Sequence, residues 1–368
     1  MNEITFPFWA WGGFGVFILI MLSIDLGLFN RQAHVPSSKE TVFWSVTWVS
    51  LALIFNVLIY YYALGHFAAA DALTAGDRAW DIALKFFTGY VIELSLSVDN
   101  LFVFLLIFSY FKVPKNYQHR VLFWGVLGAL IMRIVMIFIG AELIENFGWI
   151  IYLFGAFLVY TGIKMFREDE AEIEPEKNPV VRLVTKFIPL TKRYDGDKFF
   201  TVENGKRMGT LLLLVLIIVE VTDLVFAVDS IPAIFGITTD RFIVYTSNVF
   251  AILGLRTFFF LLVSVVEKFY LLRVGLAFVL TFIGVKMLLP LLVWGGAYLS
   301  GIRDADRLHA IEEHYGHIPI YIALLVIVGA LALSIVLSIV FPQNKRERIG
   351  DVETEIEDDY PEQESENE

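Results

Sequence analysis

Apolar stretches, most of them about 20 residues long, follow one another along this chain and leave few folds open. Such a stretch crosses a bilayer as a helix, because its backbone N–H and C=O groups must bond within the segment in lipid. The composition agrees, with 57% hydrophobic residues and a mean hydropathy of +0.69. We predict an all-α polytopic membrane protein with about nine transmembrane helices, at residues 7–29, 41–64, 82–111, 120–141, 149–166, 208–235, 242–264, 271–290 and 318–341.

Two of these apolar stretches contain acidic residues in related sequences. Gly89–Asn100 includes Glu93 and Asp99, and Val219–Ser230 includes three further acids. A charge at membrane depth costs roughly 3 to over 10 kcal/mol, so such residues normally face a cavity, a bound ion or a partner charge. The two motifs are therefore candidates for a functional site.

The similarity between the two regions extends beyond the acidic motifs. Leu127–Arg133 resembles Phe250–Arg256, and Gly162–Met165 resembles Gly284–Met287, at nearly constant offsets along the chain. Each copy spans three predicted helices, and an odd number of spans inserts the second copy upside down relative to the first. We predict two inverted three-helix repeats, an arrangement found in many secondary transporters.

Basic residues in the loops predict the orientation of the chain. Lys and Arg concentrate in the loops that share one side when the N-terminus is outside and the C-terminus is cytoplasmic. The tail after residue 350 contains ten acids and no base, accounts for most of the net charge of −11, and is predicted to be disordered. We expect two N-terminal helices with an outside loop (1–81), the first repeat (82–167), a cytoplasmic linker (168–207), the second repeat (208–290), an outside loop (291–317), the last helix (318–341) and the acidic cytoplasmic tail (342–368).

Helical spacing divides the membrane acids into two groups. Glu93 shares a face with Asn100, and Asp223 shares one with Ser230, with Glu220 one turn before it. Asp99 and Asp229 point off these faces on a straight helix. Either they serve another interface, or the backbone unwinds near 97–100 and 227–232, where Pro232 removes a helical hydrogen bond.

The candidate ligands in the membrane are nearly all oxygen donors. The chain has no cysteine, and its six histidines fall in predicted loops. Oxygen-only coordination favours Mg²⁺, Ca²⁺ or Mn²⁺ over copper or zinc, and composition favours none of these three. The candidates are Asp25, Glu93, Asp99, Asn100, Glu220, Asp223, Asp229, Ser230 and Asn248. Outside the membrane, Glu313, His314 and His317 either form a second metal site or belong to a solvated helix face.

Arg133 and Arg256 are the basic residues deep within the predicted spans. Each is expected to neutralise an aspartate, with Asp99 and Asp229 as the natural partners; the alternative is a pair of anion clamps. The excess of buried acids over bases favours a cationic substrate. Asp25 is either a site residue or a residue near a helix end, and Asn248 is either a site residue or an interhelical hydrogen-bonding group.

The motifs Glu-Leu-Ser-Leu-Ser-Val-Asp-Asn at 93–100 and Val-Glu-Val-Thr-Asp-Leu-Val-Phe-Ala-Val-Asp-Ser at 219–230 resemble those of the TerC family of integral membrane proteins, closest to its Alx branch. The resemblance runs from about Trp9 to Phe341. It implies a bacterial inner-membrane protein linked to manganese export, with an older association to tellurite resistance. The family's acidic motif positions correspond here to Glu93, Asp99, Asn100, Glu220, Asp223, Asp229 and Ser230.

These observations favour a secondary transporter that exports Mn²⁺ from the cytoplasm, with protons as the coupling ion and no prosthetic group. The alternative is an ion-sensing or scaffold protein of metal or tellurite stress, acting through the linker 168–207 and the tail. We do not expect an enzyme, because cysteine, membrane histidine and a nucleotide-binding glycine motif are all missing from the sequence. A nucleic-acid partner is not expected either, because no basic stripe is present. The oligomeric state stays open, with a homo-oligomer among the alternatives.

Overall fold

The structure is a computed structural model, and it describes residues 4, 6–29, 38–69, 71–167, 189–191, 193–203, 205–263, 271–300, 302, 304 and 318–341. Most of the predicted linker, the outside residues Glu313, His314 and His317, and the acidic tail lie outside these residues, so the structure does not test the predictions made for them.

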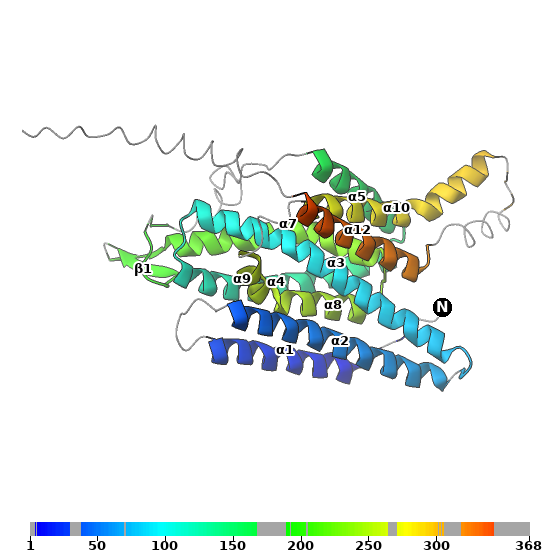
Figure 1. Ribbon diagram of the computed structural model, residues 1–368, viewed down its shortest axis with the longest axis horizontal. Helices are drawn as coiled ribbons and strands as arrows, with labels where there is room; N and C mark the ends of the chain where they lie inside the picture. The colour runs from blue at the N-terminus through cyan, green and yellow to red at the C-terminus, as the bar shows by residue number, and fades with distance from the viewer. Residues whose placement is uncertain are drawn as a thin grey trace, which may run out of the picture.

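The described chain is almost entirely helical, which confirms the predicted all-α membrane class (Figure 1). Seven of its helices are long and apolar enough to cross a membrane, and α8 with α9 forms an eighth candidate span that is bent by 41°. The first predicted span is also a helix, but the part of it whose side chains are described, Phe8–Ile24, is shorter than the seven spanning helices. The helices are α1 (Phe8–Phe29), α2 (Ser38–Ala68), α3 (Ala75–Tyr110), α4 (Lys115–Asn146), α5 (Ile150–Arg167), α7 (Leu211–Phe235), α8 (Arg241–Leu253), α9 (Leu255–Val263), α10 (Leu272–Leu299) and α12 (Ile320–Val340).

Several helices are longer than the sequence predicted. Helix α3 has 36 residues and α4 has 32. At 1.5 Å per residue, either helix exceeds the roughly 30 Å of a bilayer core, so their ends extend beyond the apolar stretch that predicted them. Hydropathy therefore located the spans but not the ends of the helices.

Side-chain caps mark the starts of α7 and α8. The Thr210 hydroxyl accepts a hydrogen bond from the backbone N–H of Leu213, and the Asp240 carboxylate accepts from those of Phe242 and Ile243 at 2.9 and 3.0 Å. Such caps contribute about 1 kcal/mol each. Both helices therefore begin at defined residues.

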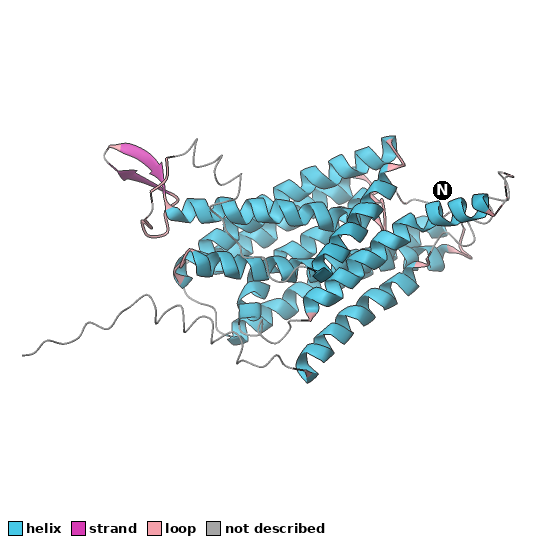
Figure 2. Ribbon diagram, turned by 90° about the horizontal axis from the view of Figure 1, so that it is seen from above, coloured by secondary structure: helices cyan, strands magenta, loops and turns pink. Residues whose placement is uncertain are grey.

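The helices form one elongated bundle (Figures 1 and 2). Helices α1 and α2 lie along one side and α5, α10 and α12 along the other, with α3, α4, α7 and α8 between them. Aromatic contacts hold α1 and α2 to the centre: the Phe55 ring lies 5.3 Å from that of Phe14 and 4.9 Å from that of Phe250, tilted by 41° in each pair. The motif helices α3 and α7 pack against each other inside this bundle.

Close backbone approach joins α5 to α10. A Cβ atom on Gly284 would lie 2.6 Å from the carbonyl oxygen of Gly155, and one on Gly162 would lie 2.8 Å from that of Ala277. Gly284 is the predicted repeat counterpart of Gly162, and at the same offset Ala277 is that of Gly155. In one contact a glycine of α10 meets a carbonyl of α5, and in the other the counterpart glycine of α5 meets the counterpart carbonyl of α10. The inverted arrangement of the repeats itself stays a prediction.

A short β-hairpin lies at one end of the bundle and was not predicted (Figure 2). Its antiparallel strands are β1 (Phe200–Glu203) and β2 (Lys206–Gly209). The hairpin region is attached to the bundle by an ion pair between Arg120 and Asp197 and by a 2.8 Å hydrogen bond from the Tyr194 hydroxyl to the Phe111 carbonyl. A hydrogen bond from Thr201 lowers the pKa of Asp195 at the base of the hairpin. The end of the predicted linker is therefore folded against the bundle.

We expect Gly284→Leu to destabilise the protein by roughly 1–3 kcal/mol, because the added side chain overlaps the α5 backbone. Thermal unfolding of the purified protein in detergent would measure this. Gly295→Ala is the control, because Gly295 lies on the same helix with nothing within 4 Å of its would-be Cβ. Equal melting temperatures for the two variants would contradict the proposed importance of this contact.

Candidate cation site in the membrane core

Four helices bring polar side chains together at the centre of the bundle. Glu93 lies on α3, Asp223 and Ser230 on α7, Arg133 on α4 and Asn248 on α8, and all five are buried. The two predicted motif faces, Glu93 with Asn100 and Asp223 with Ser230, therefore do point into the protein. They meet through Arg133, which contacts Glu93 and Asp223, and through Asn100, whose side chain bonds Asp223 directly.

Arg133 is the centre of this polar cluster. Its Nη1 atom donates to Glu93 Oε1, to Asn248 Oδ1 at 2.8 Å and to Ser230 Oγ at 3.4 Å. Its Nη2 atom lies 3.7 Å from Asp223 Oδ1, within ion-pair distance. The arginine side chain is only 1% exposed, so one guanidinium bridges the acids of both motifs away from water.

The cluster is not fully satisfied within the described chain. Glu93 Oε2, Asp223 Oδ2 and the Nε and Nη2 atoms of Arg133 are buried without a hydrogen-bond partner. A buried polar atom without a partner costs about 1–3 kcal/mol, and more when the group is charged. Two carboxylates also exceed one guanidinium by one negative charge. The site therefore has free oxygen lone pairs and an excess of negative charge.

Two other predicted acids lie beside this cluster. Glu220, one turn before Asp223 on α7, is half-buried and its carboxylate contacts Gly128 of α4, where any larger residue would overlap it. Asp229 is half-buried and accepts a hydrogen bond from Thr161 of α5 at 3.3 Å. Asp229 thus lies toward a different helix, which is one of the two alternatives that its angular position on α7 left open.

The remaining predicted residues are only partly described. Asn100 is buried and its side chain faces Asp223. Arg256 is buried at the start of α9. Asp25 and Asp99 lie on α1 and α3, but their side chains are outside the described set.

The structure corrects the expected partners of Arg133 and decides between the two alternatives for the backbone. Among the described side chains, the acids paired with Arg133 are Glu93 and Asp223, not Asp229. Helices α3 and α7 run unbroken through the segments where unwinding was an alternative, and Pro232 lies within α7 near its end. The break in the second predicted repeat instead falls at Gly254, between α8 and α9.

The histidine prediction is also wrong at two positions. His66 lies in the last turn of α2 and His119 in the first turns of α4, where it is buried. Both helices extend further than the hydropathy pattern indicated. Within the described residues, however, no group of three or more His, Cys, Asp or Glu side chains is close enough together to hold a metal ion.

Sequence reasoning missed Thr161 and Gly128. Neither lies in an acidic motif, and the third helix of the first repeat was assigned no ligand. The only available signal was position: Thr161 directly precedes Gly162, a residue of the repeated Gly-x-Lys-Met pattern.

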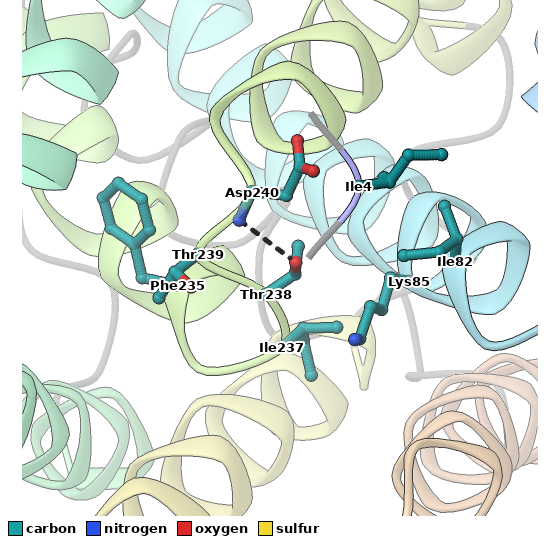
Figure 3. Close-up of a pocket in the computed structure, with 8 residues that line it drawn as sticks. All are labelled: Ile4, Ile82, Lys85, Phe235, Ile237, Thr238, Thr239 and Asp240. Atoms are coloured by element: carbon teal, nitrogen blue, oxygen red, sulfur yellow. Dashed lines mark hydrogen bonds between the residues drawn. The ribbon is translucent and has the colours of Figure 1, made fainter. Parts of the chain in front are cut away.

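An open cavity of about 210 Å³ lies near the α7–α8 connection (Figure 3). Ile82 and Lys85 of α3 line one wall, two to three helical turns from Glu93 along the same helix. The lining residues are Ile4, Ile82, Lys85, Phe235, Ile237, Thr238, Thr239 and Asp240. Lys85 is paired with Asp81 at 2.7 Å, so its charge is balanced locally.

Residues 78–346 match the model of the integral membrane protein TerC family, a range that contains all five residues of the polar cluster. This chain belongs to the TerC family. It is therefore a multi-pass membrane protein with seven or more apolar helices, as predicted.

Curated relatives agree with the family assignment. An Alx protein of Salmonella typhi, described as a candidate membrane-bound redox modulator, is 47% identical over 92% of this chain and 96% of its own length. Its Escherichia coli K12 counterpart, described in the same words, is 46% identical with the same coverage. An uncharacterized membrane protein of Myxococcus xanthus is 50% identical over 75% of this chain and 82% of its own. No solved structure matches the chain significantly.

We expect Arg133→Gln to lower the free energy of unfolding by roughly 3–5 kcal/mol in metal-free buffer, because it leaves two buried carboxylates without their counter-charge. The double variant Arg133→Gln, Glu93→Gln should recover part of this loss. Thermal unfolding in detergent, analysed as a double-mutant cycle, would measure the coupling.

The control for this cycle is Asp81→Asn, which breaks the half-exposed Lys85–Asp81 pair. Partly exposed pairs contribute up to about 1 kcal/mol, so a small effect is expected. Additive losses at Arg133 and Glu93 would show that the two residues do not act as a pair.

Proposed function

We propose that this TerC-family protein is a secondary transporter that exports Mn²⁺, a divalent metal cation, from the cytoplasm by exchange for protons. The observation that carries the proposal is the convergence of Glu93 and Asp223 on one buried cationic group. These acids come from two related motifs on two packed helices. A site that already holds a positive charge with oxygen ligands has the chemistry that a cation substrate needs.

The donor set supports a hard cation. Glu93, Asp223, Ser230 and Asn248 supply carboxylate, hydroxyl and amide oxygens, the ligands that Mg²⁺, Ca²⁺ and Mn²⁺ use. Asp99, Asn100, Glu220 and Asp229 complete the proposed ligand set, with Arg256 and Asp25 as supporting charges. Manganese is chosen among the three cations because of the family resemblance.

A route through the protein is compatible with this site. In the predicted orientation α7 runs outward, so Glu220 lies one turn on the cytoplasmic side of Asp223 and its half-buried carboxylate would meet an entering cation first. The cavity at Lys85 and Asp240 lies beyond the opposite end of the site. The proposed path therefore runs from Glu220 through Glu93 and Asp223 toward this cavity.

Helix packing supports alternating access between the proposed inverted repeats. Counterpart helices pack in pairs, α3 with α7, α4 with α8 and α5 with α10, and the crossed pairs α3–α8 and α4–α7 also pack. A pseudo-two-fold axis would produce this set of contacts. Transporters of this construction expose a central site by moving one repeat against the other.

The proposal includes a bacterial inner-membrane location, with the N-terminus outside and the C-terminus in the cytoplasm. The distribution of Lys and Arg among the loops supports this orientation. A link to tellurite resistance would follow from metal homeostasis.

The second candidate function is an ion-sensing or scaffold protein, and the folded hairpin favours it. Val202 of β1 is 71% exposed and Phe200 is 43% exposed, so the hairpin offers apolar side chains to a partner. The relatives' description as candidate redox modulators also fits a regulatory role, although this chain lacks the cysteines for thiol chemistry. Under this function, deleting residues 342–368 would abolish metal tolerance in cells while vesicle transport is absent.

We expect Glu93→Gln and Asp223→Asn each to lower the initial rate of Mn²⁺ uptake into inverted vesicles by at least about tenfold, because each removes a charged oxygen ligand. Glu203→Gln is the matched control on the exposed hairpin, and its rate should equal that of the wild type. Uptake that survives both core substitutions unimpaired would disprove the site assignment.

Proton exchange predicts a response to an imposed pH gradient. Acidifying the lumen of inverted vesicles should raise the initial rate of Mn²⁺ uptake, because protons leaving the lumen would drive the cation inward. A protonophore should return the rate to its value without a gradient. A rate indifferent to the gradient would remove protons from the mechanism and leave Mn²⁺ transport standing.

A further inference from the structure

The position best suited to a transported cation already contains a cationic side chain. Arg133 contacts Glu93, Ser230 and Asn248 and lies within ion-pair distance of Asp223. These four residues include Glu93 and Asp223, the two acids on which the proposed transport function chiefly rests. A divalent cation using the same oxygens would have to share them with the guanidinium or replace it.

We propose that Arg133 is a tethered substitute for the transported cation: its guanidinium occupies the Glu93–Asp223 site when substrate is absent and withdraws when a divalent cation binds. This inference rests on the proposed transport function and adds to it a residue that competes with the substrate. Under this proposal Arg133 does not bind the substrate. It competes with the substrate for the oxygens of Glu93 and Asp223, and so affects which cations can bind.

Charge balance at the Glu93–Asp223 pair disfavours simultaneous binding of the guanidinium and a divalent cation. Glu93 and Asp223 contribute two negative charges, so a divalent cation alone neutralises them and Arg133 alone leaves one negative charge. Both together would leave the Glu93–Asp223 pair with one excess positive charge, in a place that is shielded from water, where like charges repel strongly. Charge balance also disfavours a monovalent substrate. Such a cation would neutralise only one of the two acids, as Arg133 already does.

The bonding of Arg133 is that of a group that can be displaced. All three of its hydrogen-bond contacts share the two hydrogens of Nη1, whereas Nε and Nη2 have no hydrogen-bond partner among the described residues. A structural arginine typically uses its planar fork for two parallel bonds to a carboxylate. Glu93 Oε2 and Asp223 Oδ2 also stay free, so an arriving cation finds unoccupied lone pairs on both acids before the guanidinium leaves.

Withdrawal of Arg133 has a consequence for the transport cycle. An empty site with two bare buried carboxylates would be costly, and a side chain that returns to them stabilises the unloaded protein. Removing the arginine should therefore favour the loaded state. If only a fraction of the sites is free of Arg133, the apparent affinity for substrate is reduced by that fraction. Removing Arg133 frees all the sites and raises the apparent affinity by the inverse of the fraction.

The test compares Mn²⁺ binding and Mn²⁺ flux in the purified full-length protein. We expect Arg133→Gln to bind Mn²⁺ at least about tenfold more tightly than the wild type by titration calorimetry, and to transport it at least about tenfold more slowly in proteoliposomes. Arg133→Lys, which keeps the charge but loses the fork, should fall between the two in affinity. Arg207→Gln removes one positive charge from the exposed hairpin and should match the wild type.

A second measurement uses free guanidinium as the probe. In Arg133→Ala, guanidinium chloride at sub-denaturing concentration should weaken Mn²⁺ binding, with sodium chloride at equal concentration as the ionic-strength control. The wild type, whose own guanidinium is tethered in place, should show no such difference between the two salts. Mn²⁺ should also raise the melting temperature of Arg133→Gln more than that of the wild type, by mass action.

The outcomes separate failure of the inference from failure of the transport function. Weaker or unchanged Mn²⁺ affinity in Arg133→Gln and Arg133→Lys would overturn the substitution model and make Arg133 a support for the ligands. If Arg133→Gln does not fold, the affinity of Arg133→Lys and guanidinium competition in Arg133→Ala decide the question. Absence of Mn²⁺ binding and flux in the wild type and in all variants would instead overturn the proposed transport function.

Discussion

The buried contact of Arg133 with Glu93 and Asp223 is the interaction on which the centre of this protein depends. Three charged groups lie out of contact with water, and none is tolerable there alone because each would lose its hydration without compensation. The helices that contribute them, α3, α4 and α7, must therefore stay together, and Asn248 adds α8 through a hydrogen bond to the same guanidinium. The pairing of these buried charges therefore accounts both for the packing of the four central helices and for the location of the candidate site.

Close helix packing surrounds this polar centre and limits what can change around it. Gly128 leaves room for the Glu220 carboxylate, and Gly155 and Gly284 let α5 and α10 approach at backbone distance. In a bilayer such small residues stabilise helix pairs through contact, since lipid supplies no hydrophobic drive to join them. A bundle built from these contacts can shift as packed groups of helices, which suits a protein whose proposed work is to expose one site to two sides.

The sequence predicted the membrane-spanning helices well, because a segment that contacts lipid must be apolar and hydropathy measures this directly. The helix starting at Ala75 and the break at Gly254 were not predicted, since both lie where polar or packing contacts, rather than lipid, decide the backbone. The hairpin of Phe200–Gly209 was missed for a similar reason. Its strands are short and mostly exposed, and they depend on attachment near Asp197 and Tyr194 to helices distant in sequence.

By itself, the sequence determined which acids lie within apolar helices and which of them share a helical face. The seven-residue spacing placed Glu93 with Asn100 and Asp223 with Ser230. The angular offset of Asp229 left two alternatives, a different interface or an unwound backbone, and the continuous α7 with Thr161 bonded to Asp229 gives the first. Only the tertiary structure decided which charge Arg133 neutralises. Helical periodicity orients a side chain about its own axis but does not say which helices stand opposite one another. The packing of α3, α4, α7 and α8 placed the guanidinium between the acids that the motifs had marked for a cation.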